Sequence, residues 1–354
     1  RDLVTRISGG LAHWAERLEM SPFRLRVTGT AGSGKTQLAL AEYQRALSEG
    51  KQPLYVCFNR PLADHFARIV PEGGRVCTFH MLCDQRLRAA GVTPDFSGPG
   101  AFDDLVARAA ALPLTETDLC DVLIVDEGQD FPESWRNGVF AHARPEARVI
   151  WLEDPLQNLY GHSLSPLPGW VGLRADTNYR SPRAIVRLLA DLLPEHRPIE
   201  AASPFGGNDI DLLSYGSEEE MEQRVREAIR QCYAAGFRKE DVVLLSYHGR
   251  ESSHLTRRGQ LGSHRLRAFT GRYDILGQPV YSAGDLLMES VFRFKGQSAP
   301  AVILAEIDFR QLDDNARRRL FVGATRATMR LTLVAAEASA TCLRDQLGLG
   351  EPSK

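Results

Sequence analysis

The sequence has no excess of positive charge, no paired cysteine motif and no long hydrophobic run. Its 354 residues carry a net charge of −2, which excludes a histone-like protein that binds nucleic acid through overall charge. The six cysteines form no CxxC pair and show no zinc spacing, and most lie in apolar runs, so we interpret them as reduced core residues of a cytoplasmic protein. No apolar stretch reaches membrane-spanning length and no signal peptide is visible, so we expect no membrane partner.

Hydrophobic residues make up 43% of the chain, which is enough for two globular domains, each with its own core. Short apolar runs alternate with helical patterns, and this order favours an α/β fold of parallel sheets with crossover helices. We expect two lobes, at about 1–170 and 171–345, followed by a tail at 346–354. The runs that we expect to be strands are 23–28, 54–58, 121–127, 148–153, 209–213, 241–246, 301–307 and 330–335.

One expected helix is marked at both of its ends. Ser217 and Glu220 have the spacing of a capping box, and Gly236 stands where the helix would stop. Between these two signals, apolar residues recur on a single helical face. The pattern predicts a helix between residues 217 and 236.

A phosphate-binding loop is the most specific motif in the sequence. Residues 29–36 fit the pattern G-x-x-x-x-G-K-[ST] and lie between an expected strand and an expected helix. Lys35 would bring positive charge to the β- and γ-phosphates, and Thr36 would offer a hydroxyl to Mg²⁺. A Gly-rich turn without function is the alternative. The residues expected to contact the nucleotide here are Gly29, Thr30, Ala31, Gly32, Ser33, Gly34, Lys35 and Thr36.

Two carboxylates, Asp126 and Glu127, end one of the expected buried strands. A strand end at this edge of a parallel sheet lies beside the phosphate loop. Asp126 would hold Mg²⁺, and Glu127 would orient or deprotonate the attacking water. A solvated strand end is the alternative, which the phosphate loop upstream makes weaker.

Several segments, in order, resemble the motifs of UvrD/Rep/PcrA-type superfamily 1 helicases, over about residues 24–335. Asp126–Asp130 resembles the family's DExQD motif, which follows the phosphate loop. The other segments that carry the resemblance are 59–63 (motif Ia), 78–80 (Ib), 157–160 (III), 178–181 (IV), 294–296 (V) and 322–327 (VI). The resemblance implies two RecA-like P-loop NTPase lobes with small insertions, ATP and Mg²⁺ in the cleft between them, and single-stranded DNA as partner.

The resemblance also assigns roles to residues outside the phosphate loop. Gln157 would sense the γ-phosphate, and Arg180 and Arg326 would reach it from the second lobe, where charge spreads over its oxygens. Tyr179 would stack on the adenine. Gln37 would lie near the base and Gly296 of motif V near the nucleotide.

The residues expected to bind nucleic acid are implied by the same resemblance. Aromatic faces accept any base by stacking, which would allow binding without sequence preference. Arg293 would contact phosphates. The other expected contacts are Phe58, Asn59, His80, Tyr160 and His162, the last of which stands where the family usually has Trp.

The sequence departs from the large helicases of this family in its short insertions. Only about residues 81–117 and 247–289 remain for them, which leaves room for a helical hairpin and for two or three strands. The alternatives that stay open are an ATP-binding switch module without unwinding activity and an RNA-directed helicase. The sequence begins with Arg1 rather than Met, so an N-terminal domain or a partner subunit outside it also stays open.

Overall fold

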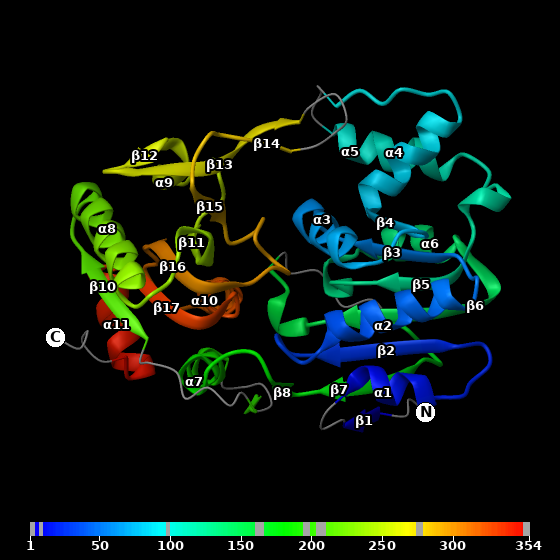
Figure 1. Cartoon of the computed structure of the whole chain (residues 1–354), viewed down its shortest axis with the longest axis horizontal. Coiled ribbons are helices and arrows are strands. Elements are labelled where there is room, and N and C mark those ends of the chain that lie inside the picture. The colour runs from blue at the N-terminus through cyan, green and yellow to red at the C-terminus, as the bar shows by residue number, and fades with distance from the viewer. Residues whose placement is uncertain are drawn as a thin grey trace. The chain divides into compact units, whose positions relative to one another are not determined.

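In the computed structural model the chain forms two compact units, Arg1–Thr177 and Asn178–Lys354. Both are α/β units built on sheets in which parallel strands predominate, so the predicted fold class is confirmed (Figure 1). The residues that the structure describes are 4–6, 10–96, 100–159, 166–193, 199–202, 210–273 and 279–349.

The division between the units differs from the predicted boundary at residue 170. Strand β7 (Val171–Ala175) follows that position and pairs in parallel with β2 (Arg24–Gly29) of the first sheet. The division therefore falls after Thr177. The alternating pattern of β7 predicts neither its partner nor its unit, because both depend on pairing with a strand far away in the sequence.

The sheet of the first unit is wholly parallel and has the order β1-β7-β2-β6-β5-β3-β4. Its other strands are β1 (Val4–Arg6), β3 (Pro53–Cys57), β4 (Arg75–Thr78), β5 (Cys120–Val125) and β6 (Ala143–Glu153). Helices cover both faces of such a sheet, so its central strands read as nearly continuous hydrophobic runs. Strands β2 and β5 have only β6 between them, which brings the ends of the two functional motifs to one edge.

Two hydrophobic cores line the opposite faces of this sheet. Tyr55 and Ile124 belong to the core under α1, α2 and α3, whereas their neighbours Leu54 and Leu123 belong to the core under α4, α5 and α6. This alternation follows from the two-residue period of a strand. The helices are α1 (Leu11–Arg17), α2 (Lys35–Ser48), α3 (Arg60–Ile69), α4 (Phe79–Ala89), α5 (Ala101–Ala110) and α6 (Glu133–Phe140).

The second unit contains a sheet in the order β10-β17-β16-β11-β15-β13-β12, with β14 paired to β13. Strands β12 and β14 are antiparallel to β13, and the other pairs are parallel. Two further short strands, β8 (Thr177–Asn178) and β9 (Glu200–Ala201), pair with each other. The strands of the main sheet are β10 (Asp211–Tyr215), β11 (Val242–Ser246), β12 (Gln260–Leu261), β13 (His264–Tyr273), β14 (Pro279–Tyr281), β15 (Leu286–Ser290), β16 (Ala299–Ile307) and β17 (Ala327–Ala336).

The helix expected between Ser217 and Gly236 is α8 (Glu218–Ala234). The Ser217 hydroxyl accepts a hydrogen bond from the Glu220 N–H at 3.2 Å, as a capping box requires. The Glu220 carboxylate, however, accepts from the N–H of Gly216, one residue earlier than the motif predicts. The other helices of this unit are α7 (Arg183–Leu192), α9 (His254–Arg257), α10 (Asp314–Ala324) and α11 (Glu337–Leu347).

The six cysteines are all free thiols, and five of them are buried, as their apolar surroundings predict. Cys342 in α11 is half-buried. In the part of the chain that the structure describes, no helix combines the length and the apolar character that a membrane span requires.

Candidate functional site

The phosphate loop connects β2, which ends at Gly29, to α2, which begins at Lys35. Gly34 caps the helix with a φ of 95°, a backbone region that favours glycine. No side chain of the described residues caps this helix, so its first N–H groups face the loop, where a phosphate would bind. A Cβ added to Gly29 would lie 2.4 Å from Ser33 Oγ, so a larger residue at this strand end would require the Ser33 hydroxyl to move.

The polar groups inside the loop are arranged for an anion. Lys35 Nζ donates to the carbonyl oxygens of Gly29 and Thr30, at 2.5 and 3.0 Å. The hydroxyls of Thr30 and Ser33 are buried and have no hydrogen-bond partner among the described residues. Unpaired buried hydroxyls destabilise a protein by about 1–3 kcal/mol each. Phosphate oxygens would supply the missing acceptors, so the loop fits the group that its motif predicts.

Asp126 and Glu127 follow β5 at the same edge of the sheet, and both are buried. The Asp126 carboxylate accepts from the Tyr55 hydroxyl at 2.7 Å and from the Glu127 N–H at 2.9 Å. Burial, and then the neighbouring charge of Glu127, raise the pKa of Asp126. A bound divalent cation would lower the pKa of Asp126 again, because its positive charge favours the ionised carboxylate.

Glu127 is held in a left-handed backbone conformation, with a φ of 56°. Such a conformation costs a non-glycine residue on the order of 1–3 kcal/mol, and it is found disproportionately at functional sites. The next residue explains the turn, since a Cβ on Gly128 would lie 2.3 Å from the buried ring of Trp151. This close packing directs the chain sharply away from β5 directly after the two carboxylates.

A buried network of hydrogen bonds joins Glu127 to Gln157. Gln129 donates to the Glu127 carboxylate at 2.5 Å and accepts from the Asp154 N–H at 2.9 Å. Gln157 in turn donates to the Asp154 carboxylate at 2.6 Å. Lys35 Nζ lies 4.0 Å from the same carboxylate. Three of the predicted catalytic residues are therefore connected through Asp154.

Asp154 and Gln129 were not among the predicted site residues. Asp154 follows β6, so the rule that identified Asp126, a carboxylate after a buried strand beside the phosphate loop, also applies to it. Burial raises the pKa of Asp154, while Lys35 opposes the shift. Gln129 is the Gln of the DExQD motif quoted above, but its bridge to Asp154 depends on the approach of β5 to β6.

Thr36 and Asp126 are the residues predicted to hold Mg²⁺. Thr36 lies half-buried in the first turn of α2, and Asp126 supplies a buried carboxylate. No group of three or more His, Cys, Asp or Glu side chains among the described residues could hold a metal. One carboxylate, a hydroxyl, water and phosphate oxygens are the ligands that Mg²⁺ usually takes, so the donor set fits this ion.

The predicted nucleic-acid contacts Phe58 and His80 lie against a common ring. Phe58 stacks on Trp135 with ring centroids 5.8 Å apart, and His80 meets the same ring edge-on at 4.6 Å. Burial lowers the pKa of His80, which favours a neutral ring that can stack. Trp135 in α6 was not predicted, because its approach to these residues is tertiary.

The other predicted residues of the first unit have separate environments. Asn59 caps α3, its side-chain oxygen accepting from the Leu62 N–H at 2.9 Å, which gives it a structural role. Gln37 is exposed on the first turn of α2. Tyr160 and His162 lie outside the described residues.

In the second unit, the predicted residues Arg180 and Arg326 meet at Thr325. Arg180 donates to the Thr325 carbonyl at 2.9 Å, and Arg326 donates to the Thr325 hydroxyl at 2.8 and 3.1 Å. Arg326 also bonds to the carbonyls of Val322 and Gln297, both at 3.0 Å. The end of α10 thus positions both guanidinium groups. Thr325 lies within motif VI, but the sequence pattern assigns it no role of its own.

The remaining predicted residues of the second unit differ in exposure. Tyr179 is 42% exposed, so its ring is open to stacking. Gly296 has a φ of 82° in the turn between β15 and β16. Arg293 lies 3.2 Å from the Glu289 carboxylate and 3.8 Å above the Phe269 ring. A nucleic-acid phosphate would therefore have to compete with the Glu289 carboxylate for the Arg293 guanidinium.

Comparisons with known proteins give one family match. Residues 285–334, from the end of the 247–289 segment through α10 into β17, match the family model of the UvrD-like helicase C-terminal domain. One solved structure, arterivirus nonstructural protein 10 (helicase) in complex with DNA, shares 14% identity with a TM-score of 0.44. That alignment covers 92% of this chain, and the chain spans 63% of the length of that helicase.

No curated protein matches the chain by sequence. The family match falls on the segment that contains motifs V and VI as quoted above. The predicted resemblance to UvrD-like helicases is therefore confirmed over residues 285–334.

Proposed function

We propose that this chain is an ATP-hydrolysing motor that moves along single-stranded nucleic acid, as a 3′-to-5′ DNA translocase or helicase. The observation that carries the proposal is the buried network from Lys35 through Asp154 to Gln157 and Glu127. The network connects Lys35 beside the phosphate loop with the residues that we propose as base and as γ-phosphate sensor, and this connection supports the proposal. The direction of movement and the choice of DNA rest on the sequence resemblance.

The residues of the first unit would divide the chemistry among themselves. Lys35 would exchange its bonds to the loop carbonyls for bonds to the β- and γ-phosphates. Thr36 and Asp126 would hold Mg²⁺, which when bound neutralises charge on these phosphates. Glu127 would accept a proton from the attacking water, and Gln157 would respond to the γ-phosphate through Asp154.

The two arginines of the second unit are proposed to supply further positive charge to the γ-phosphate. Charge spreads over the phosphate oxygens in the transition state, and guanidinium groups stabilise it by bidentate hydrogen bonds. Their common attachment to Thr325 brings both groups to one helix end. Arg326 is 2% exposed and donates to Val322, Gln297 and Thr325, so it would have to exchange some of these bonds for bonds to phosphate. Phe58, His80 and Trp135 are half-buried rings that pack on one another, and we propose that bases stack on the parts of these rings that remain exposed.

The ATPase rate tests this function directly. We expect single-stranded DNA to raise the rate, and we expect DNA binding to weaken with salt because phosphate contacts release counterions. Parallel measurements with single-stranded RNA and with duplex would identify the preferred strand. A nucleotide-binding switch would instead show tight ATP binding with a rate that no nucleic acid changes, and this result would contradict the motor.

Nucleotide choice is expected to be relaxed. The family usually has an Arg at the position of Gln37 and a ribose-binding Glu at the position of Ser298, and both residues are exposed here. A serine cannot form the same charge-assisted bond, which contributes about 1.5–3 kcal/mol. Tyr179 remains, and stacking accepts any purine. We expect kcat/KM for GTP and dATP within roughly tenfold of ATP, or about 1.4 kcal/mol.

Steady-state kinetics with the three nucleotides check this prediction. The Tyr179→Ala variant serves as the comparison, since it should weaken all three nucleotides alike if stacking is the main base contact. Discrimination of a hundredfold or more against GTP would reveal a base-reading contact elsewhere in the protein.

A further inference from the structure

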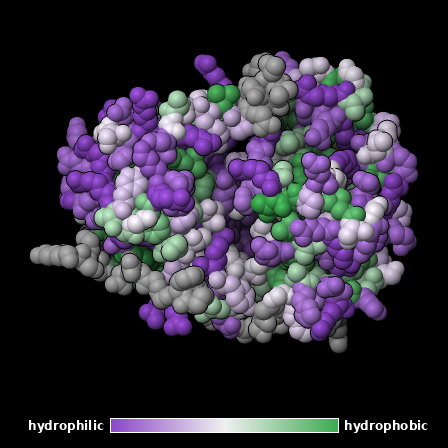
Figure 2. All heavy atoms as spheres, viewed as in Figure 1, coloured by the Kyte–Doolittle hydropathy of each residue, from purple (hydrophilic) through white to green (hydrophobic). Residues whose placement is uncertain are grey.

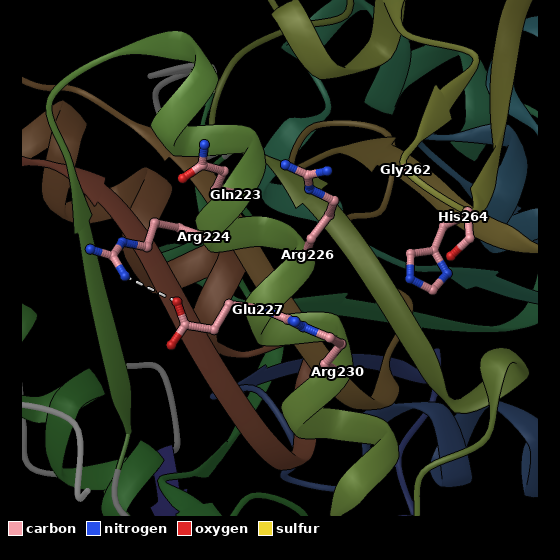
Figure 3. A pocket seen from close by; sticks show the side chains of 8 residues that line it. Gln223, Arg224, Arg226, Glu227, Arg230, Gly262 and His264 are labelled. Atoms are coloured by element: carbon pink, nitrogen blue, oxygen red, sulfur yellow. Dashed lines mark hydrogen bonds and ion pairs between the residues drawn. The ribbon is translucent and has the colours of Figure 1, made fainter.

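A second candidate site lies in the second unit, away from the motifs described above. An open cavity of about 640 Å³ separates α8 from the turn between β12 and β13 (Figure 3). Every residue that lines it is polar, charged or glycine, and Arg226, Arg230, Ser263 and His264 are among them. Small-molecule sites usually enclose most of their ligand, whereas this cavity is open, so it does not have the character of a metabolite pocket.

The arginines of the cavity differ in their ion pairs. Arg224 pairs with Glu220 and Glu227, at 3.2 and 3.0 Å, and Figure 3 shows it on the side of α8 away from Gly262 and His264. Arg226 and Arg230 have no carboxylate within 4.0 Å among the described residues. They lie one turn apart, about 6 Å along the helix axis, and share its face.

The turn of the hairpin brings its backbone close to Arg226. A Cβ added to Gly262 would lie 3.1 Å from Arg226 Cδ, and Gly262 has a φ of 60°. Glycine at this position thus leaves room for the Arg226 side chain beside the turn. His264 follows on β13 and packs edge-on against Tyr233 at 5.8 Å, which fixes its ring at the cavity wall.

The lining of the cavity carries more positive than negative charge. It includes three arginines and a single carboxylate, Glu227, whereas the chain carries a net charge of −2. The surface over α8 in Figure 2 is predominantly hydrophilic. A local basic surface on an acidic protein is the electrostatic footprint of a polyanion site.

We propose that Arg226 and Arg230 bind phosphates of a nucleic-acid backbone, at a site separate from the ATP site. Arginine is well suited to phosphodiesters because its planar donors form bidentate bonds. An open cavity lined by two unpaired guanidinium groups one turn apart suits a continuous strand that passes across it. The inference rests on the proposed function, since it extends the path of the strand on the second unit.

The test compares the double variant Arg226→Gln/Arg230→Gln with the unchanged protein, using a fluorescent single-stranded oligonucleotide. Each phosphate contact contributes about 0.7 to the slope of log K against log salt for single strands, so the slope should fall by roughly 1.4. At 0.1 M salt this corresponds to binding on the order of 25-fold weaker. The basal ATPase rate should stay unchanged.

Two further variants serve as controls. Arg183→Gln/Arg187→Gln removes two exposed arginines at the same spacing on α7 of the same unit, and it should change the slope little. Arg226→Lys/Arg230→Lys keeps the charge and should retain most of the slope. If the α7 control variant loses as much of the slope of log K against log salt, the effect comes from general charge and the proposal is overturned.

Inorganic phosphate and pyrophosphate are the remaining probes. If either binds tightly to the unchanged protein and is lost in the double Gln variant while the oligonucleotide slope is unaltered, the cavity is a small-anion site. An unaltered slope overturns this inference alone and leaves the motor intact. Failure of the unchanged protein to bind any oligonucleotide would overturn both.

Discussion

The Glu127→Gln variant should bind ATP as the unchanged protein does and hydrolyse it on the order of a hundredfold more slowly, or slower still. Glutamine keeps the size of the side chain and can still accept the bond from Gln129. It cannot take a proton from water, and positioned bases contribute about 10²–10⁴-fold to such reactions. The loss should therefore appear in kcat and not in nucleotide affinity.

Phosphate release under saturating ATP and Mg²⁺ measures kcat, and titration with a labelled nucleotide measures nucleotide affinity. Glu72→Gln is the matched control, because it makes the same change at an exposed carboxylate outside the network. A Glu127→Gln protein with near-normal turnover would remove the assignment of Glu127 as base. The base would then have to be sought among the other buried carboxylates.

The Lys35→Ala variant should lose affinity for the triphosphate itself. The ammonium group lies in the loop with only 10% of its side chain exposed, bonded to two carbonyls that a phosphate would replace. A charge-assisted hydrogen bond contributes about 1.5–3 kcal/mol, so Kd for ATP should rise by roughly ten- to a hundredfold. Turnover should fall as well, because the same charge stabilises the transition state.

Lys51→Ala is the control for this variant, since Lys51 lies just beyond the other end of α2 and forms an exposed pair with Glu49. Thermal unfolding of both variants would show whether the first unit remains folded. If Lys35→Ala binds ATP within twofold of the unchanged protein, the loop does not hold the triphosphate in the proposed way.

The strands that the sequence predicts are those with a long apolar run. Each of the eight expected runs contains or overlaps a strand of the structure, from β2 to β17. The strands that were not predicted, such as β4 (Arg75–Thr78) and β7, are short or interrupted by polar residues and glycine. They become strands because a neighbour supplies backbone partners, and a periodic pattern does not contain that information.

The candidate site likewise combines residues that the sequence predicts with contacts that it does not. The phosphate loop and the Asp126–Glu127 pair are local patterns at strand ends, so the sequence predicts their places. The bond from Tyr55 to Asp126 depends on the register of β3 against β5, and the contact of His80 with Trp135 depends on how α4 packs against α6. These distances are set by tertiary packing and could be known only from the structure.

Arg180 and Arg326 share one hydrogen-bond partner, Thr325, and this links their energetic contributions. Arg180 is held by the backbone of this residue and Arg326 by its hydroxyl, so a movement of the end of α10 carries both guanidinium groups at once. Groups with a common partner do not contribute independently, and their effects on mutation are coupled by about 0.5–3 kcal/mol. If both act on the γ-phosphate as proposed, their contributions to binding it are coupled and will not simply add.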